Sequence, residues 1–107
     1  MNLPDPIRRY FEADTNLDGD SPADAFTADA SVHDEGETHV GRAAISAWWR
    51  AAKRKYRHTA VPLEMRQAEG ATEVRAMVSG DFPGSPAPLT FVFGLDGGQI
   101  ARLKIGA

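Results

Sequence analysis

The 107-residue chain contains no cysteine, which excludes disulfide bonds, thiolate catalysis and zinc–thiolate sites. It also has no run of 18 or more apolar residues, so no segment is predicted to span a membrane. The first six residues lack the basic region and apolar core of a signal peptide, and we expect a cytoplasmic protein. Since repeats, low-complexity tracts and linkers are absent too, residues 1–107 are predicted to form one domain.

The net charge of the chain is small, because 15 acidic and 12 basic residues give −3. This balance gives no overall attraction to nucleic acid. A local basic cluster lies beside aromatic residues and consists of Arg50, Lys53, Arg54, Lys55 and Arg57. We interpret it as the solvent side of an amphipathic helix and expect no nucleic-acid partner.

Three helices are predicted in the first 56 residues. The first covers about residues 5–15, where prolines occupy the first turn and one face carries Ile7, Tyr10, Phe11 and Asp14. Ser21-Pro22 predicts the start of a short second helix that ends near Phe26. The third, about 42–56, has a regular apolar stripe formed by Ile45, Trp48, Trp49, Ala52 and Tyr56.

Alternating apolar residues predict strands in the rest of the chain. A short strand, 30–34, precedes the third helix, and four antiparallel strands follow at 58–68, 72–82, 89–95 and 99–105. Asp96-Gly97-Gly98 is a hairpin signal between the last two. Helices gathered on one face of a curved antiparallel sheet make an α+β domain, with a concave pocket expected between helices and sheet.

Two segments carry a family resemblance, Phe26-Thr27-Ala28-Asp29-Ala30-Ser31-Val32-His33-Asp34 and Gly41-Arg42-Ala43-Ala44-Ile45. With the order of elements, they resemble the nuclear transport factor 2-like superfamily, in its SnoaL-like and ketosteroid-isomerase-like branches. The resemblance implies a cone-shaped curved antiparallel sheet with three N-terminal helices on its concave face. It also implies an apolar pocket that needs no cofactor and, often, a homodimer. The fold hosts isomerases, cyclases, dehydratases and binding modules, so it does not by itself specify an activity.

Ketosteroid isomerases use a tyrosine on the first helix and an aspartate on the first strand, with a protonated aspartate on a late strand as second oxyanion donor. By resemblance, Tyr10 is the oxyanion donor and Asp34 the proton shuttle, 24 residues apart as in that family. The third acid is missing, because its position falls on Thr90 or Phe91. Trp49 stands where the family has a supporting tyrosine. Steroid isomerase activity is therefore not expected.

Each of these residues also has a structural interpretation. Asp34 could cap the turn at Glu35-Gly36 instead of facing a pocket. Tyr10 could be a core tyrosine bonded to a neighbouring side chain instead of a ligand. Asp14, one turn further along the same helix face, either enters the pocket or lies at the helix end.

The predicted pocket holds a small apolar or cyclic carbonyl compound between aromatic walls. Trp48 and Trp49 are about 100° apart on a helix, so one is expected to line the pocket while the other packs on the sheet. Beside Tyr10 and Asp34, the expected lining residues are Asp14, Phe26, Trp48, Trp49, Val61, Leu63, Val78, Phe91, Phe93 and Leu103.

No metal site is predicted. Residues 14–20 resemble the start of a calcium loop, but the twelfth position is Ala25 instead of a glutamate, and we interpret the segment as a helix stop followed by an N-cap. His33, His39 and His58 lack the spacing of helical metal ligands. A serine nucleophile elbow is absent as well.

Two functions remain open at this point. One is a cofactor-free enzyme for isomerisation, cyclisation or dehydration, in which Asp34 moves a proton and Tyr10 polarises a carbonyl. The other is a non-catalytic binding or assembly module on the same fold, which the missing third acid favours. A homodimer is expected in either case, since Phe82, Met77 and strands 89–105 supply more apolar surface than three short helices cover.

Overall fold

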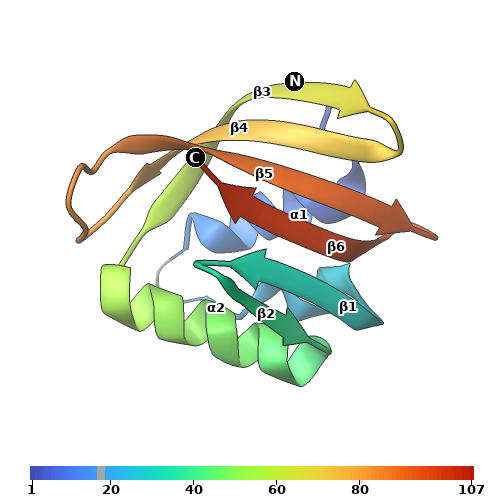
Figure 1. The fold of residues 1–107 in the computed structure, drawn as a ribbon, viewed down its shortest axis with the longest axis horizontal. Helices are drawn as coiled ribbons and strands as arrows, with labels where there is room; N and C mark the ends of the chain where they lie inside the picture. The colour runs from blue at the N-terminus through green and yellow to red at the C-terminus, as the bar shows by residue number, and fades with distance from the viewer. Residues whose placement is uncertain (17–18) are drawn as a thin grey trace.

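The computed structural model describes residues 1–16 and 19–107 and shows an α+β fold with a curled, open sheet (Figure 1). Its helical elements are α1 (Asp5–Asp14), the 3-10 turn η1 (Pro22–Ala25) and α2 (Arg42–Tyr56). Its strands are β1 (Phe26–Asp34), β2 (Glu37–Val40), β3 (Thr59–Ala68), β4 (Ala71–Ser79), β5 (Ala87–Asp96) and β6 (Gln99–Gly106). None of the described helices is long and apolar enough to cross a membrane.

The six strands form one sheet in the order β2-β1-β6-β5-β4-β3. Neighbouring strands are antiparallel except β1 and β6, which are parallel. The prediction of an antiparallel sheet is therefore correct for the hairpins that join β3 to β6 and wrong for the β1–β6 pair. The chain leaves β1, passes through β2, α2 and three further strands, and returns beside β1 in the same direction.

The predicted second helix is only one 3-10 turn, so the described residues form two α-helices instead of three. Four residues, Pro22–Ala25, make the turn, and Phe26 is already extended at φ −101° and ψ 153°. The burial of Phe26 explains the early change to a strand, because its side chain is fully enclosed in the core. As a result β1 begins at Phe26, four residues before the predicted start.

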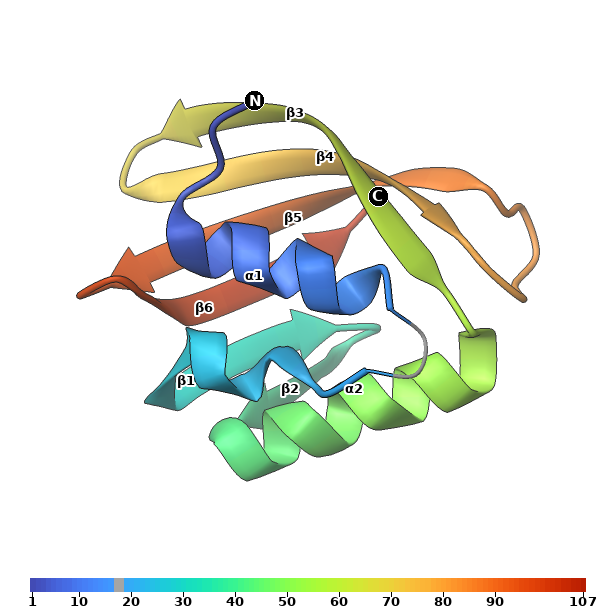
Figure 2. The ribbon, with the colours of Figure 1, turned by 180° about the vertical axis from the view of Figure 1, so that it is seen from behind.

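α1 lies across the inner face of the sheet (Figure 2). Its buried residues include Ile7, Tyr10, Phe11 and Asp14, the face predicted from the sequence. The Tyr10 and Phe11 rings contact those of Phe91 and Phe93 on β5, with centroids 5.1 to 6.1 Å apart. Edge-to-face packing of this kind fixes the helix against the strand.

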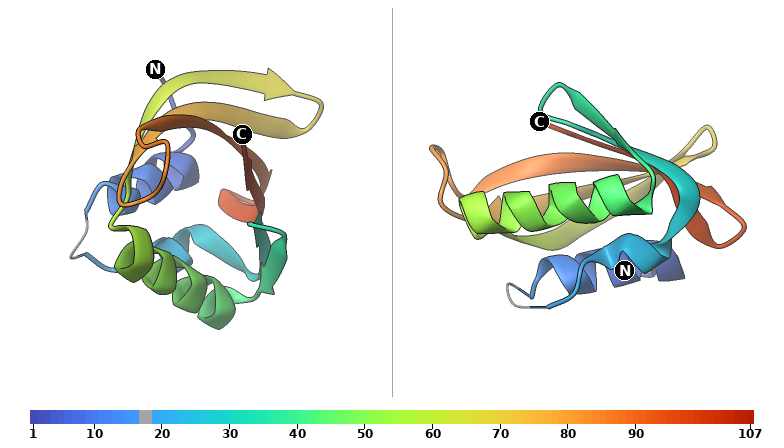
Figure 3. Two further views of the ribbon diagram at one scale, coloured as in Figure 1. Left: turned by 60° about the vertical axis from the view of Figure 1, so that its left-hand side comes forward. Right: turned by 90° about the horizontal axis from the view of Figure 1, so that it is seen from below.

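α2 runs below β1 and β2, and in a side view the sheet curls around α1 (Figure 3). Its buried residues are Ile45, Trp49 and Lys53, spaced four apart on one helix face. The prediction that the basic residues all face solvent is therefore wrong for Lys53, whose side chain is only 6% exposed. The helix ends at Arg57, which adopts a left-handed conformation with φ 46° and turns the chain into β3.

The register of β3 changes at a bulge between Pro62 and Glu64. Ala60 is fully buried, whereas Val61 and Leu63 are 55% and 52% exposed. Successive side chains of a strand point to opposite faces, so burial of Ala60 places Val61 on the outer face. The expectation that Val61 and Leu63 line an internal pocket is therefore wrong.

Candidate functional site

A cavity of about 410 Å³ lies where α1, α2, the end of β1 and the loop between β4 and β5 meet. This volume suits a small organic ligand. Its lining combines aromatic, aliphatic and acidic residues: Tyr10, Asp14, Asp34, Glu35, Trp48, Ala52, Tyr56, His58, Val78, Phe82, Pro83, Ala87, Leu89, Phe91 and Ile105.

Asp34 is the last residue of β1 and is half-buried at the cavity wall. The Trp48 indole Nε1 donates a hydrogen bond to Asp34 Oδ2 at 3.1 Å. Burial raises the pKa of the Asp34 carboxyl above its usual value, and the nearby Glu35 carboxylate adds to this, while the Trp48 hydrogen bond opposes it. A carboxyl group with a raised pKa can take up and release a proton more readily near neutral pH.

Tyr10 places its phenol ring at the same cavity from α1 and is 1% exposed. Among residues 1–16 and 19–107, no side chain or backbone group is hydrogen-bonded to its hydroxyl. Burial raises the pKa of Tyr10 well above its usual value, and the Asp14 and Asp34 carboxylates raise it further. The hydroxyl therefore stays protonated and keeps a free O–H donor.

Asp14 ends α1 and is the centre of a buried network. Its Oδ1 accepts a hydrogen bond from Trp49 Nε1 at 3.1 Å and lies 3.0 Å from Lys53 Nζ. Lys53 Nζ also donates to the backbone carbonyls of Asp14 and His58, each at 2.6 Å. This single ammonium group thus joins α1 and α2 to His58, the residue just before β3.

His58 lies beside Asp14, with its Nε2 3.6 Å from Asp14 Oδ1. Burial by itself would raise the pKa of the Asp14 carboxyl, but His58 and Lys53 hold that pKa below its usual value. Asp14 is therefore ionised. Its second oxygen, Oδ2, is buried and has no hydrogen-bond partner in the described part of the chain.

Gly80 allows close packing at this corner. A Cβ atom at position 80 would lie 2.7 Å from the Tyr56 carbonyl oxygen and 2.9 Å from His58 Cα. Real Cβ atoms do not approach backbone so closely, so glycine lets the end of β4 meet the junction of α2 and β3. The Asp81 N–H then donates to the Tyr56 carbonyl at 2.6 Å, which holds that junction in place.

The structure brings half of the twelve residues predicted for the site to the cavity wall: Tyr10, Asp14, Asp34, Trp48, Val78 and Phe91. Phe26, Phe93 and Leu103 are buried in the hydrophobic core instead and do not line the cavity. Trp49 is also buried and turned to Asp14, so Trp48 is the tryptophan that lines the cavity. Val61 and Leu63 are on the exposed part of β3.

Of the two positions considered for a third acid, Phe91 lines the cavity. Thr90 accepts a hydrogen bond from Arg75 Nη1 at 2.7 Å on the other side of β5. The apolar ring of Phe91 therefore faces the cavity at this position of β5, where a third acid was considered.

Three polar residues at the cavity were not singled out as site residues from the sequence: Glu35, Tyr56 and His58. The Tyr56 hydroxyl donates to Glu35 Oε1 at 2.8 Å and so connects the end of α2 with the turn after β1. Lys53, which holds Asp14 and His58, was missed as well. Its spacing of four from Trp49, on the stripe that begins at Ile45, is the signal that could have placed it inside.

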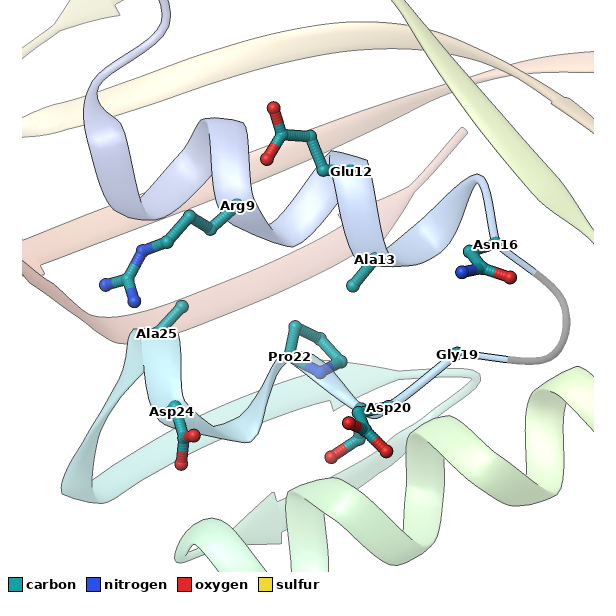
Figure 4. Close-up of a pocket in the computed structure, with 10 residues that line it drawn as sticks. Arg9, Glu12, Ala13, Asn16, Gly19, Asp20, Pro22, Asp24 and Ala25 are labelled. Carbon is teal, nitrogen blue, oxygen red and sulfur yellow. The ribbon is translucent and has the colours of Figure 1, made fainter.

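A second, polar groove of about 360 Å³ lies between α1 and the segment that ends in η1 (Figure 4). Its charged lining residues are Arg9, Glu12, Asp20 and Asp24, and none of the residues predicted for the site faces it. Leu17 and Asp18 of the calcium-like sequence lie outside the described residues. Within residues 1–16 and 19–107, no cluster of three or more histidine and acidic side chains could hold a metal ion.

Comparison with solved structures relates the whole fold to other proteins. A candidate polyketide cyclase from Sinorhizobium meliloti is 48% identical, with 96% of this chain and 94% of that one covered and a TM-score of 0.90. A Catenulispora acidiphila protein with a ketosteroid isomerase-like fold, solved in complex with trimethylamine, is 19% identical. In that comparison 99% and 87% of the chains are covered and the TM-score is 0.84.

A cystatin-fold protein from Novosphingobium aromaticivorans is 18% identical over 100% of this chain and 99% of that one, with a TM-score of 0.77. None of the curated proteins matches the chain. The SnoaL-like domain family, in contrast, matches residues 7–103, nearly the full length. This match is consistent with the curled six-stranded sheet and the cavity beneath it. The chain belongs to the SnoaL-like domain family.

Proposed function

We propose that the protein catalyses a cofactor-free proton transfer on a small apolar or cyclic carbonyl compound bound in the cavity. One observation carries the proposal: the half-buried Asp34 carboxyl and the unpartnered Tyr10 hydroxyl line the same cavity. The similarity to a candidate polyketide cyclase supports a carbonyl substrate. Isomerisation, cyclisation and dehydration of a carbonyl compound all begin when a base removes a proton from the carbon next to the carbonyl group.

In the first step, the Asp34 carboxylate removes a proton from the carbon next to the carbonyl group. The electron pair of the broken C–H bond moves to the carbonyl oxygen and gives an enolate, while Asp34 becomes a neutral carboxylic acid. The Tyr10 hydroxyl donates a hydrogen bond to the enolate oxygen and stabilises its charge. Return of the proton from Asp34 to a different carbon completes an isomerisation and restores the carboxylate.

Phe91 limits the rate that this site can reach. A second strong donor would stabilise the enolate further, and loss of one such donor typically costs about 3 kcal/mol in the transition state. We therefore expect slow or absent turnover of a β,γ-unsaturated ketosteroid, and any turnover to disappear in Asp34→Asn.

The direct test follows the first step alone. In D2O, the protein should accelerate exchange of the α-protons of 2-tetralone, a bicyclic ketone, as followed by proton NMR. Asp34→Asn, which keeps an acceptor for Trp48, should abolish the acceleration, and Tyr10→Phe should reduce it about 100-fold. Asp96→Asn, an exposed aspartate in the β5–β6 hairpin, is the matched control and should leave it unchanged.

The second candidate is a binding module, which the apolar Phe91 favours. In that case 2-tetralone would bind without any exchange above the rate in buffer. Exchange that survives Asp34→Asn would likewise overturn the catalytic proposal.

A further inference from the structure

The cavity carries more negative than positive charge on its wall. Three of its described lining residues are acidic, Asp14, Asp34 and Glu35, and none of them is a lysine or an arginine. Lys53 lies 3.0 Å from the Asp14 carboxylate and balances that charge, although it does not itself line the cavity. His58, whose Nε2 is 3.6 Å from Asp14 Oδ1, can balance at most one further charge. The wall therefore keeps an excess of negative charge in either protonation state of His58.

Asp34 and Glu35 have neutral hydrogen-bond donors and no salt bridge. The Trp48 indole N–H donates to Asp34, and the Tyr56 hydroxyl donates to Glu35. No cationic side chain of residues 1–16 and 19–107 forms an ion pair with either carboxylate. Lys55 is attracted to Glu35, but its ammonium group is exposed over the Tyr56 ring, 5.0 Å from the centroid, where water screens its charge. Both negative charges are therefore left to act on a ligand in the cavity.

Burial makes an uncompensated charge at Asp34 costly. Asp34 is half-buried at the cavity wall, and this burial raises the pKa of its carboxyl group. A positive charge beside it would stabilise the carboxylate and lower that pKa again. A cationic ligand thus gains interaction energy here that a neutral ligand of the same shape does not gain.

Aromatic rings lie beside the two carboxylates. Trp48 and Tyr56 line the cavity with their hydrogen-bond partners, and Phe82 packs edge-on to Tyr56 with ring centroids 6.2 Å apart. The faces of aromatic rings attract positive charge, most strongly where water is excluded. No group of three or more histidine and acidic side chains in the described part of the chain could hold a metal ion. An organic ammonium ion, whose charge is covered by alkyl groups, suits a wall of rings and carboxylates.

A separate feature indicates that this cavity holds a ligand. Tyr10 lines it and is 1% exposed, yet its hydroxyl has no protein hydrogen-bond partner among the described residues. Buried hydroxyl groups are normally bonded, so an acceptor on a ligand would complete the site.

We propose that Asp34, Glu35 and the rings beside them make the cavity selective for a carbonyl compound that also carries a positively charged amine. The carbonyl half of this class rests on the proposed function. The charged half rests on the unbalanced carboxylates and the aromatic wall alone.

Binding of three matched ketones tests the charge preference without any need for turnover. Acetyl-N,N,N-trimethylanilinium and tert-butylacetophenone have the same shape and differ only in charge, because a quaternary nitrogen replaces a quaternary carbon. Acetylbenzenesulfonate carries a negative charge at the same place. Each is titrated in its para and meta isomers and followed by 1H–15N NMR. In at least one isomer the ammonium ketone should bind about tenfold more tightly than the tert-butyl ketone, and the sulfonate should bind most weakly.

Glu35→Gln removes one charge from the wall and keeps an acceptor for Tyr56. It should weaken binding of the ammonium ketone about threefold and leave the tert-butyl ketone unchanged. Glu69→Gln is the matched control, because Glu69 is an exposed glutamate with the same left-handed backbone in the turn between β3 and β4, and it should leave both affinities unchanged.

The two tryptophans locate the ligand in the unaltered protein. The indole N–H signal of Trp48, at the cavity wall, should move when the ammonium ketone binds. The signal of Trp49, which is bonded to Asp14 in the core, should move less.

Equal or weaker binding of the ammonium ketone would overturn the proposal, as would failure of every probe to bind. A preference that Glu35→Gln leaves intact, or that Glu69→Gln reduces equally, would overturn it too, since the overall charge of the protein would then be the cause. The exchange assay uses 2-tetralone, which is neutral, and reports on catalysis separately. Exchange without a charge preference removes this proposal alone, and a charge preference without exchange removes the catalytic proposal alone.

Discussion

The Tyr10 hydroxyl is a polar group that folding buries without a protein hydrogen bond among the described residues. Removing an unsatisfied buried hydroxyl relieves its desolvation cost while the ring keeps its packing. We expect Tyr10→Phe to leave the free energy of unfolding unchanged or to raise it by up to about 1 kcal/mol. Urea unfolding measures this, and a loss of more than 1 kcal/mol would reveal a structural hydrogen bond and weaken the role proposed for Tyr10.

Asp34 makes stability depend on pH in a defined direction. Burial raises its pKa in the folded protein above the unfolded value of about 3.9. Above that range the ionised carboxylate costs the folded state stability, and below the unfolded pKa both states are protonated and the cost vanishes. Asp34→Asn should therefore melt at a higher temperature than the unaltered protein at pH 7, with the difference shrinking to nothing towards pH 3. A constant difference across this range would contradict the assignment.

At the level of single residues, the family resemblance and a shared helix or strand face allowed us to predict that Tyr10 and Asp34 line the cavity, and their catalytic roles stay predictions. His58 and Lys53 could not be predicted with equal ease. Lysine usually faces solvent, and only the Asp14 carboxylate and two carbonyls make its burial tolerable. Two of those partners belong to Asp14 at the end of α1 and the third to His58 just before β3, and no local pattern brings these segments together.

On the scale of elements, the Asp14–Lys53 pair ties α1 to α2 and to the start of β3. Lys53→Met leaves a buried carboxylate without its counter-charge, which typically costs about 3–5 kcal/mol of stability. Replacing both partners, as in Asp14→Asn with Lys53→Met, should recover most of that loss, because no charge is then buried.

Chemical unfolding of the single and double variants measures the coupling between the two residues. Lys55→Met, an exposed lysine in the last turn of the same helix, is the control and should change stability by less than about 0.5 kcal/mol. If the double variant loses as much as Lys53→Met alone, the pair does not act as one unit.

The elements with regular periodicity were predictable. The prolines and apolar face of α1, the stripe of α2 and the alternation in β4, β5 and β6 each indicate the observed structure. β2 was missed, because Glu37-Thr38-His39-Val40 has no apolar alternation and is held by its pairing with β1. The parallel pairing of β1 with β6 joins segments about 70 residues apart, and nothing in either segment specifies its partner.

For the whole molecule, a homodimer remains a prediction. Val61 and Leu63 expose apolar side chains on the outer face of β3, and pairing with a second copy would cover them. We expect sedimentation equilibrium at micromolar concentration to give twice the chain mass of 11.6 kDa. Leu63→Lys should shift the protein to the chain mass, because an unpaired charge would be buried in the interface. A single 11.6 kDa species for the unaltered protein would contradict this prediction.

The close packing at Gly80 also bears on how fast a ligand enters and leaves. The loop that follows it is fixed at both ends, since Gly80 N–H donates to Ser85 Oγ at 2.9 Å and Asp81 N–H donates to the Tyr56 carbonyl. The exposed hydrogen bond between Tyr56 and Glu35 also lies at the cavity wall, and it breaks at little cost. A ligand should therefore enter and leave the cavity past the turn after β1. Glu35→Ala should raise the association and dissociation rates of a ketone together, as line-shape NMR would measure, while its equilibrium affinity stays the same.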